Sequence, residues 1–179
     1  MLQSSIKFKI WCTDFTYLKL TDGTFGYNWS ILDLYDRSIV VSITVREITS
    51  ELAIKALGKG LKKVKKIRNK IILHSDQGSQ YTLKKFVGYC EKNIIQKSMS
   101  RVGCPYDNAP MERYFNTLKN ELINHYYYKT EKEIYESIKE FAYIYIWYNH
   151  IRPHSYNDYM TPYEKRGNFK KVNKEINFN

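Results

Sequence analysis

The 179-residue sequence has few features of a secreted, membrane-bound or zinc-binding protein. Its three cysteines are widely spaced and form no C-x-x-C pair, so they predict neither a disulfide framework nor a zinc site. The longest uncharged apolar stretch, Phe141 to Tyr148, is far shorter than the roughly 20 residues that cross a bilayer. The N-terminus lacks the apolar region of a signal peptide. We therefore expect free thiols and a soluble, cytoplasmic protein with no membrane partner.

Acidic residues are scarce relative to basic ones. The chain has 29 Lys and Arg residues against 18 Asp and Glu, which gives a formal net charge of +11. Such an excess favours polyanionic partners, nucleic acid among them. AT-biased coding would also produce a chain rich in Lys, Asn, Ile and Tyr. The charge by itself therefore leaves nucleic-acid binding open.

Hydrophobic periodicity predicts an α/β domain. Loosely alternating apolar residues indicate three strands joined by turns, at 6–20, 25–34 and 39–45. The elements that follow are a helix from Thr49 or Ser50, a strand at 70–73, a helix at 82–93, a strand at 94–99, a helix from Pro110 to about Leu122 and a longer helix from Thr130. This order predicts a mixed sheet flanked by helices.

Three carboxylates stand at the ends or starts of predicted elements. Asp14 lies on the first strand, Asp76 follows the fourth strand, and Glu112 lies in the first turn of a helix. Each has an ordinary structural explanation: an exposed strand residue, an Asp turn before glycine, and a carboxylate that favours the helix dipole. As a cluster they would repel one another unless divalent cations neutralised them. Mg²⁺ prefers oxygen ligands, and two ions roughly 4 Å apart can clamp the attacking and leaving oxygens of a phosphodiester.

Four motifs in order carry a resemblance to a known family. They are WCTDFTYL (11–18), HSDQGSQY (74–81), SMSRVGCPYDNAPMERYFNTLKNE (98–121) and YNHIRPH (148–154), the last followed by TPYE. Together they resemble the integrase-like catalytic core of bacterial transposases of the insertion-sequence-three family. The 35 residues between the second and third carboxylates match the spacing of that family. Four motifs at compatible distances are a specific signal.

The resemblance implies a ribonuclease-H-like fold, with a mixed five-stranded sheet flanked by helices and a helical C-terminal extension. It implies DNA cleavage and strand transfer by an Asp-Asp-Glu triad at Asp14, Asp76 and Glu112, which holds two Mg²⁺ or Mn²⁺ ions. The family's basic residue seven places after the glutamate is Lys119 here. Two further residues, Arg101 and Asn108, precede the glutamate helix and are candidate DNA contacts.

Several of these residues have competing explanations. Lys119 could instead form a Glu–Lys pair on the helix surface. Asn108 could cap the helix. His74 is adjacent to Asp76, but a histidine at a strand end is more often structural, so we do not place it among the catalytic residues.

We divide the chain into an integrase-like core, residues 1–125, and a helical extension, residues 126–179, that packs on it. The expected partners are DNA, as transposon ends and target, and further copies of the chain on that DNA. Full family members carry an upstream helix-turn-helix region. The ten residues before Trp11 do not resemble it. We therefore expect a catalytic core alone, as a truncated copy or as a product that needs a helix-turn-helix protein from an upstream frame.

Two other functions remain open from the sequence. The first is a related nuclease, for example one that cuts RNA–DNA hybrids, although the spacing of the carboxylates and the YNHIRPH segment argue against it. The second is a remnant without enzymatic activity that binds DNA weakly through its charge. The intact triad argues against loss of metal chemistry, whereas the missing recognition region argues for loss of transposition.

Overall fold

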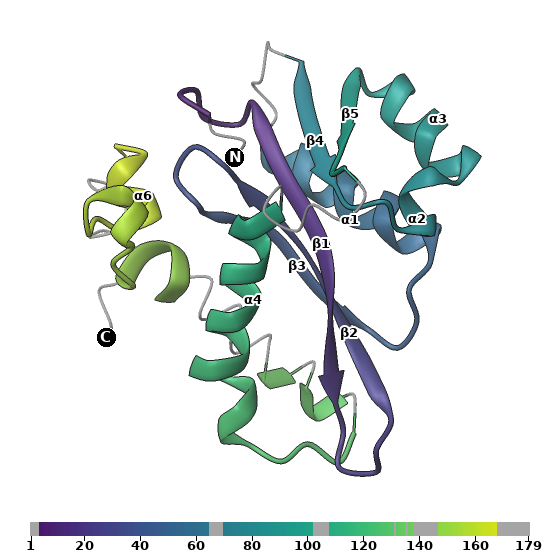
Figure 1. The fold of residues 1–179 in the computed structure, drawn as a ribbon, viewed down its shortest axis with the longest axis vertical. Helices are drawn as coiled ribbons and strands as arrows, with labels where there is room; N and C mark the ends of the chain where they lie inside the picture. The colour runs from purple at the N-terminus through teal and green to yellow at the C-terminus, as the bar shows by residue number, and fades with distance from the viewer. Residues whose placement is uncertain are drawn as a thin grey trace.

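Five strands form one mixed sheet at the centre of the protein (Figure 1). The computed structural model describes residues 4–64, 70–101, 108–130, 132–134, 136–137 and 147–167. The strands are β1 (Ile10–Lys19), β2 (Phe25–Asp33), β3 (Ile39–Val45), β4 (Ile71–Ser75) and β5 (Ile95–Met99). Their order in the sheet is β3-β2-β1-β4-β5. Because β1 pairs antiparallel with β2 and parallel with β4, it joins the two halves of the sheet.

Helices cover both faces of this sheet (Figure 1). On one face lie α1 (Ser50–Lys63), α2 (Ser79–Thr82) and α3 (Lys84–Lys92). On the other lies α4 (Ala109–Glu121), followed by the 3-10 helix Ile123–His125. The predicted mixed sheet flanked by helices is therefore confirmed. Thr49 caps α1 as expected, since its side chain accepts a hydrogen bond from the Leu52 backbone N–H.

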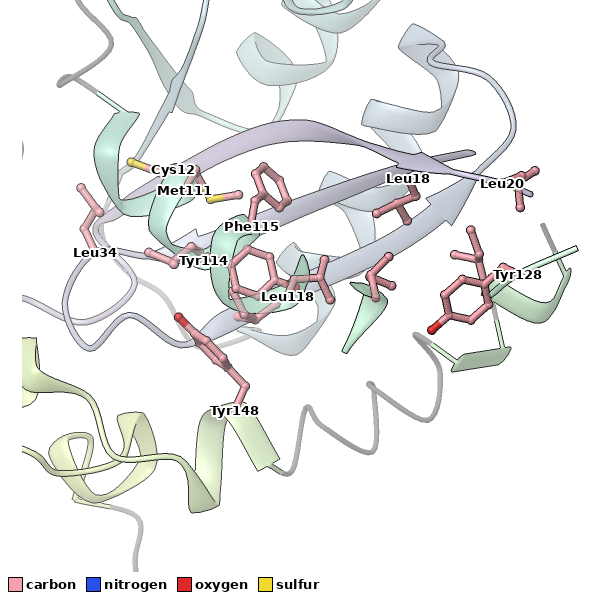
Figure 2. Packing of buried hydrophobic residues seen from close by; sticks show 14 of the residues in the cluster. Cys12, Leu18, Leu20, Leu34, Met111, Tyr114, Phe115, Leu118, Tyr128 and Tyr148 are labelled. Carbon is pink, nitrogen blue, oxygen red and sulfur yellow. The ribbon is translucent and has the colours of Figure 1, made fainter. Parts of the chain in front are cut away.

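The alternation of side chains along β1 divides the core into two layers. Trp11 packs with residues of α1 and α3, whereas its neighbour Cys12 packs on the opposite face. Figure 2 shows this second layer, where Met111 and Leu118 of α4 point at the sheet. The buried stripe of α4 therefore decides which face of that helix remains available for chemistry.

Several predicted boundaries differ from the structure. The helix predicted at 82–93 is two helices, because Leu83 has extended backbone (φ −60°, ψ 138°) and interrupts the helical turn. The first strand begins at Ile10, since Phe8 just before it has a positive φ of 60°. The strand predicted at 70–73 continues to Ser75, so Asp76 follows it directly. Most of the helix predicted from Thr130 lies outside the described residues.

The structure also bears on the cysteines and on membrane-spanning helices. Cys12 and Cys90 are free thiols and both are buried, and Cys104 lies outside the described residues. No helix in the described ranges is long and apolar enough to cross a membrane.

The C-terminal segment, residues 147–167, is built from short elements: the π-helix Trp147–Ile151, the 3-10 helix Ser155–Asn157 and α6 (Pro162–Lys165). The Asn149 amide exchanges two hydrogen bonds with the backbone of Ile39, at 2.8 and 3.1 Å. The Asn157 amide donates to the backbone oxygen of Asp36 at 2.7 Å. These contacts attach the segment to the turn between β2 and β3.

Arg166 completes this attachment with an ion-pair network. Its guanidinium donates to both carboxylate oxygens of Asp36, to Asp33 and to the Ser38 hydroxyl. Both aspartates are fully buried. Burial, and then the charge of Asp36, raises the pKa of Asp33 to about 6. Two buried carboxylates thus depend on one arginine for compensation.

We expect Arg166→Ala to lower the free energy of unfolding by about 3 kcal/mol, because removing one partner leaves buried charges uncompensated. Urea denaturation followed by circular dichroism measures the change. Lys165→Ala is the control, since Lys165 lies 4.0 Å from the exposed Asp158. Exposed pairs contribute only about 0–1 kcal/mol. Equal losses in the two variants would contradict the network's role.

Candidate active site

The pairing of β1 with β4 brings the first two carboxylates together. The parallel register aligns Ile10 with Ile72 and Cys12 with His74. Continued by two residues, the same register brings Asp14 level with Asp76. The two residues are far apart in the sequence, and the adjacent parallel strands make them neighbours.

The arrangement disfavours ionisation of Asp14. Burial raises its pKa to about 7, and the charge of Asp76 and, to a smaller degree, that of Glu112 add to the rise. Two hydrogen bonds act in the opposite direction: the Phe15 N–H donates to Oδ1 at 2.8 Å and the Asn108 amide donates to Oδ2 at 3.1 Å. Asp76 and Glu112 therefore both lie within electrostatic reach of Asp14.

The side chain of Asp76 also forms the turn that the Asp-Gln-Gly sequence predicts. Its Oδ1 accepts a hydrogen bond from the Gly78 N–H at 3.0 Å. The carboxylate is half-buried at the end of β4. The turn therefore orients the carboxylate and does not remove it from the site.

Glu112 lies in the first turn of α4 and is exposed. The helix begins at Ala109, one residue before the predicted Pro110, which occupies the second position. Met111 and Phe115 are buried beneath the helix. Since α4 packs against β1 (Figure 1), its first turn presents Glu112 on the same side of the sheet as Asp14.

The donor chemistry of the three carboxylates fits a hard divalent cation. Within the described residues, no three His, Cys, Asp or Glu side chains converge closely enough to hold a metal ion as they stand. The oxygen donors are nevertheless those that Mg²⁺ or Mn²⁺ prefers. The repulsion that helps to raise the pKa of Asp14 is what a bound cation would relieve. A complete ligand set would require the exposed Glu112 side chain to turn toward the two aspartates.

Asn108 occupies the N-cap position of α4 without capping it. Its side chain makes no hydrogen bond to the first turn of the helix, so the capping alternative is wrong. The amide instead joins α4 to β1 through Asp14 Oδ2. Its Oδ1 is buried and has no hydrogen-bond partner among the described residues. Contact of Asn108 with DNA stays a prediction.

His74 acts as a link between strands. Its Nδ1 lies 3.0 Å from Ser98 Oγ and its Nε2 lies 3.1 Å from Ser100 Oγ, and the ring is buried. Both ring nitrogens are thus engaged with the chain at the end of β5. These contacts agree with the structural explanation for this histidine.

The two basic residues predicted to contact DNA, Arg101 and Lys119, come before and after Asn108 in the sequence. Lys119 is half-buried two turns after Glu112 on α4, and it forms no salt bridge with the described part of the chain. The alternative of a Glu–Lys surface pair therefore has no support. Arg101 is exposed after β5, and residues 102–107 beyond it lie outside the described residues.

Tyr81 is a residue of this region for which the sequence pattern predicts no role. It is the last residue of HSDQGSQY and is fully buried on α2. Its hydroxyl accepts a hydrogen bond from Trp29 Nε1 at 2.8 Å. Its place in this motif was the available signal, but the contacts of Tyr81 with β1 and β2 depend on the tertiary fold.

Comparison with models of known families shows to which family the chain belongs. The chain matches two models described as the integrase core domain, one over residues 5–105 and one over residues 93–162. The chain belongs to the integrase core domain family. The integrase core thus includes Asp14 and Asp76 in one matched range and Glu112 in the other.

Curated relatives of this integrase core come from bacterial insertion sequences. The transposase for insertion sequence element IS904 of Lactococcus lactis subsp. lactis (strain IL1403) is 38% identical over 86% of this chain and 59% of its own length. Transposase InsF for insertion sequence IS3A of Escherichia coli (strain K12) is 33% identical over 85% of this chain and 51% of its own length. The predicted resemblance to the insertion-sequence-three family is confirmed. The chain spans about half the length of these relatives.

Solved structures support the ribonuclease-H-like fold. A chain of the simian T-cell lymphotropic virus intasome, in complex with PP2A regulatory subunit B56 gamma, matches with a TM-score of 0.70 and 18% identity, over 86% of this chain and 52% of that chain. The HTLV-2 integrase catalytic core domain in complex with magnesium matches with a TM-score of 0.62 and 16% identity, over 88% and 95%. The Mos1 transposase catalytic domain, with Raltegravir and Mg, gives 0.64 and 10%, over 75% and 70%. At these identities the likeness concerns the fold.

The raised pKa of Asp14 makes the stability of the metal-free integrase core depend on pH. The folded pKa of about 7 exceeds the ordinary value of 3.8. The cost of ionising Asp14 is therefore complete above about pH 7, shrinks as the pH falls through that value and vanishes below about pH 4. We expect Asp14→Asn to raise the midpoint of thermal unfolding near pH 8 in EDTA, and the difference from wild type to shrink toward about pH 4.

The control is Asp22→Asn. Asp22 is exposed, and hydrogen bonds from Thr24 lower its pKa, so its replacement should give no such rise near pH 8. Equal midpoints for wild type and Asp14→Asn at both ends of this pH range would show that the Asp14 charge carries no cost.

Proposed function

We propose that this integrase core is the catalytic part of a transposase, which cleaves DNA and transfers strands with divalent metal through Asp14, Asp76 and Glu112. The observation that carries the proposal is the β1–β4 register, which brings Asp14 level with Asp76 beside the helix of Glu112. The raised pKa of Asp14 supports it, because self-repelling carboxylates are typical of sites that bind cations. The transposase names of the curated relatives agree with it.

Each of the three carboxylates would have a role that follows from its position. Asp14 and Asp76 would hold the cations from the sheet, oriented by the N–H groups of Phe15 and Gly78. Glu112 would complete the ligand set from α4. When bound, two Mg²⁺ or Mn²⁺ ions would supply activation of the attacking oxygen and stabilisation of the leaving oxygen of the phosphodiester.

The chain would meet DNA through its basic residues. The net charge of +11 supports binding to a polyanion. Lys119 lies two turns along α4 from Glu112, where it would reach a phosphate next to the reacting one. Arg101 and Asn108 would contact DNA at the entrance to the same helix.

The whole transposition reaction would need more than these residues. Since the chain spans about half the length of its curated relatives, we propose that recognition of the transposon ends comes from a helix-turn-helix region of an upstream frame. We also propose that copies of the chain assemble on DNA to join the ends to a target. The intasome and the dimeric HTLV-2 core among the structural neighbours agree with such assembly.

Strand transfer tests the triad. With a helix-turn-helix region fused upstream, we expect the protein to join element-end DNA only in the presence of Mg²⁺ or Mn²⁺ and a free 3′-hydroxyl. Asp76→Asn and Glu112→Gln should each reduce the rate by about a thousandfold, which corresponds to about 4 kcal/mol in the barrier. Glu51→Gln, on the exposed surface of α1, is the matched control and should keep the wild-type rate. Full activity in either triad variant would exclude the assigned chemistry.

Salt dependence tests the DNA contact of Lys119. We expect the isolated chain to bind DNA with little preference for element ends and with an affinity that falls steeply with salt. Removing one phosphate contact by Lys119→Ala should reduce the slope of log K against log salt by about 1. Lys59→Ala, on the outer side of α1, should leave the slope unchanged. Salt-resistant, end-specific binding by the isolated chain would contradict nonspecific phosphate contact.

A further inference from the structure

The Tyr81 hydroxyl joins three elements beneath the carboxylates. It accepts a hydrogen bond from Trp29 Nε1 on β2 at 2.8 Å and lies 3.4 Å from Thr13 Oγ1 on β1. An indole N–H can only donate, so the hydrogen of the Tyr81 hydroxyl is left for Thr13. The Thr13 hydroxyl in turn donates to the backbone oxygen of Ser30 at 2.9 Å. The direction of the chain of hydrogen bonds is therefore set at both ends, because the Trp29 indole can only donate and the Ser30 carbonyl can only accept.

Tyr81 is also connected to the carboxylate of Asp76. The Tyr81 N–H donates to the Gly78 oxygen at 3.0 Å, and the Gly78 N–H donates to Asp76 Oδ1 at 3.0 Å. The segment from Asp76 to Tyr81 is thus one short unit that is anchored at both ends. A shift of Tyr81 would be transmitted to the turn that orients Asp76.

Both sequence neighbours of Asp14 touch this tyrosine. Thr13 contacts the hydroxyl, and the ring of Phe15 lies 6.0 Å from the Tyr81 ring between centroids. On the other side, the Phe86 ring packs edge-on at 5.6 Å. The position of Tyr81 is therefore determined by packing and by hydrogen bonds together.

The backbone pairing of β1 with β4 sets the register of the two aspartates but stops short of them. The paired residues of β1 and β4 end at Cys12 and His74, two positions before the carboxylates. Beyond that point, Tyr81 on α2, the helix that follows β4 and Asp76 in the chain, contacts Thr13 of β1 and Trp29 of β2 through its hydroxyl. Ligating carboxylates are commonly held by such outer contacts, whose loss weakens metal binding.

We propose that Tyr81 is a positioning residue, which sets the separation of the Asp14 and Asp76 carboxylates and thereby the affinity of the site for divalent cations. This inference rests on the proposed function, because it takes the two aspartates as metal ligands. A hydroxyl with a purely structural role would instead stabilise the fold without changing the response to metal.

The test is a metal titration of the full 179-residue chain, with MgCl₂ or MnCl₂ added while thermal unfolding is followed. Tyr81→Phe keeps the ring and removes the hydroxyl. We expect the metal concentration that gives half of the maximal rise in midpoint to increase about tenfold. Thr13→Val breaks the same link from β1 and should have a similar effect. For metal affinity the double variant should add little, because both changes break the same Tyr81–Thr13 contact.

Tyr128→Phe is the matched control. Tyr128 is buried and its hydroxyl lies 2.9 Å from Ser137 Oγ, at the end of the α4-side layer far from Cys12 (Figure 2). Its loss should lower the midpoint without metal and leave the half-saturating concentration unchanged.

Two results would overturn the inference, and they differ from one another. If wild type responds to metal and both Tyr81→Phe and Thr13→Val respond at the same concentration, the hydroxyl is structural only. If wild type shows no response to metal, the aspartates are not ligands and the proposed function itself fails. Should Tyr81→Phe not fold, Thr13→Val decides between these outcomes.

Discussion

The parallel pairing of β1 with β4 is the interaction on which the site depends. It aligns two strands from distant parts of the chain and brings Asp14 level with Asp76. The same arrangement has an electrostatic consequence, because burial and then the charge of Asp76 disfavour ionisation of Asp14. The fold is therefore less stable than it could be at the site where the proposed chemistry needs negative charge.

Structural support for this arrangement reaches β1 from both faces of the sheet. On one face, Asn108 connects the start of α4 to the Asp14 carboxylate. On the other, Tyr81 connects α2 to the residue before Asp14. The C-terminal segment acts farther away, where Asn149 and Arg166 hold the turn between β2 and β3. The turn between β2 and β3 is thus held by contacts that involve neither Asp14 nor Asp76.

Elements that depend on residues close together in the sequence are predicted more accurately than those that depend on distant contacts. β3 begins and ends where the alternation of apolar residues predicts, and Thr49 caps α1 through a contact three residues away. The helix predicted at 82–93 is divided because its periodicity does not reveal the extended backbone of Leu83. Asn108 has the right residue type for a cap, but a carboxylate 94 residues away receives its hydrogen bond instead.

The sequence by itself determined the family, the order of the elements and the three candidate carboxylates, because motifs, periodicity and capping depend on residues close together in the chain. Only the tertiary structure decided that Asp14 lies level with Asp76, that the pKa of Asp14 rises to about 7, and that Asn108 and Tyr81 hold the surrounding elements together. These properties depend on register, burial and contacts between distant segments, which no local pattern contains.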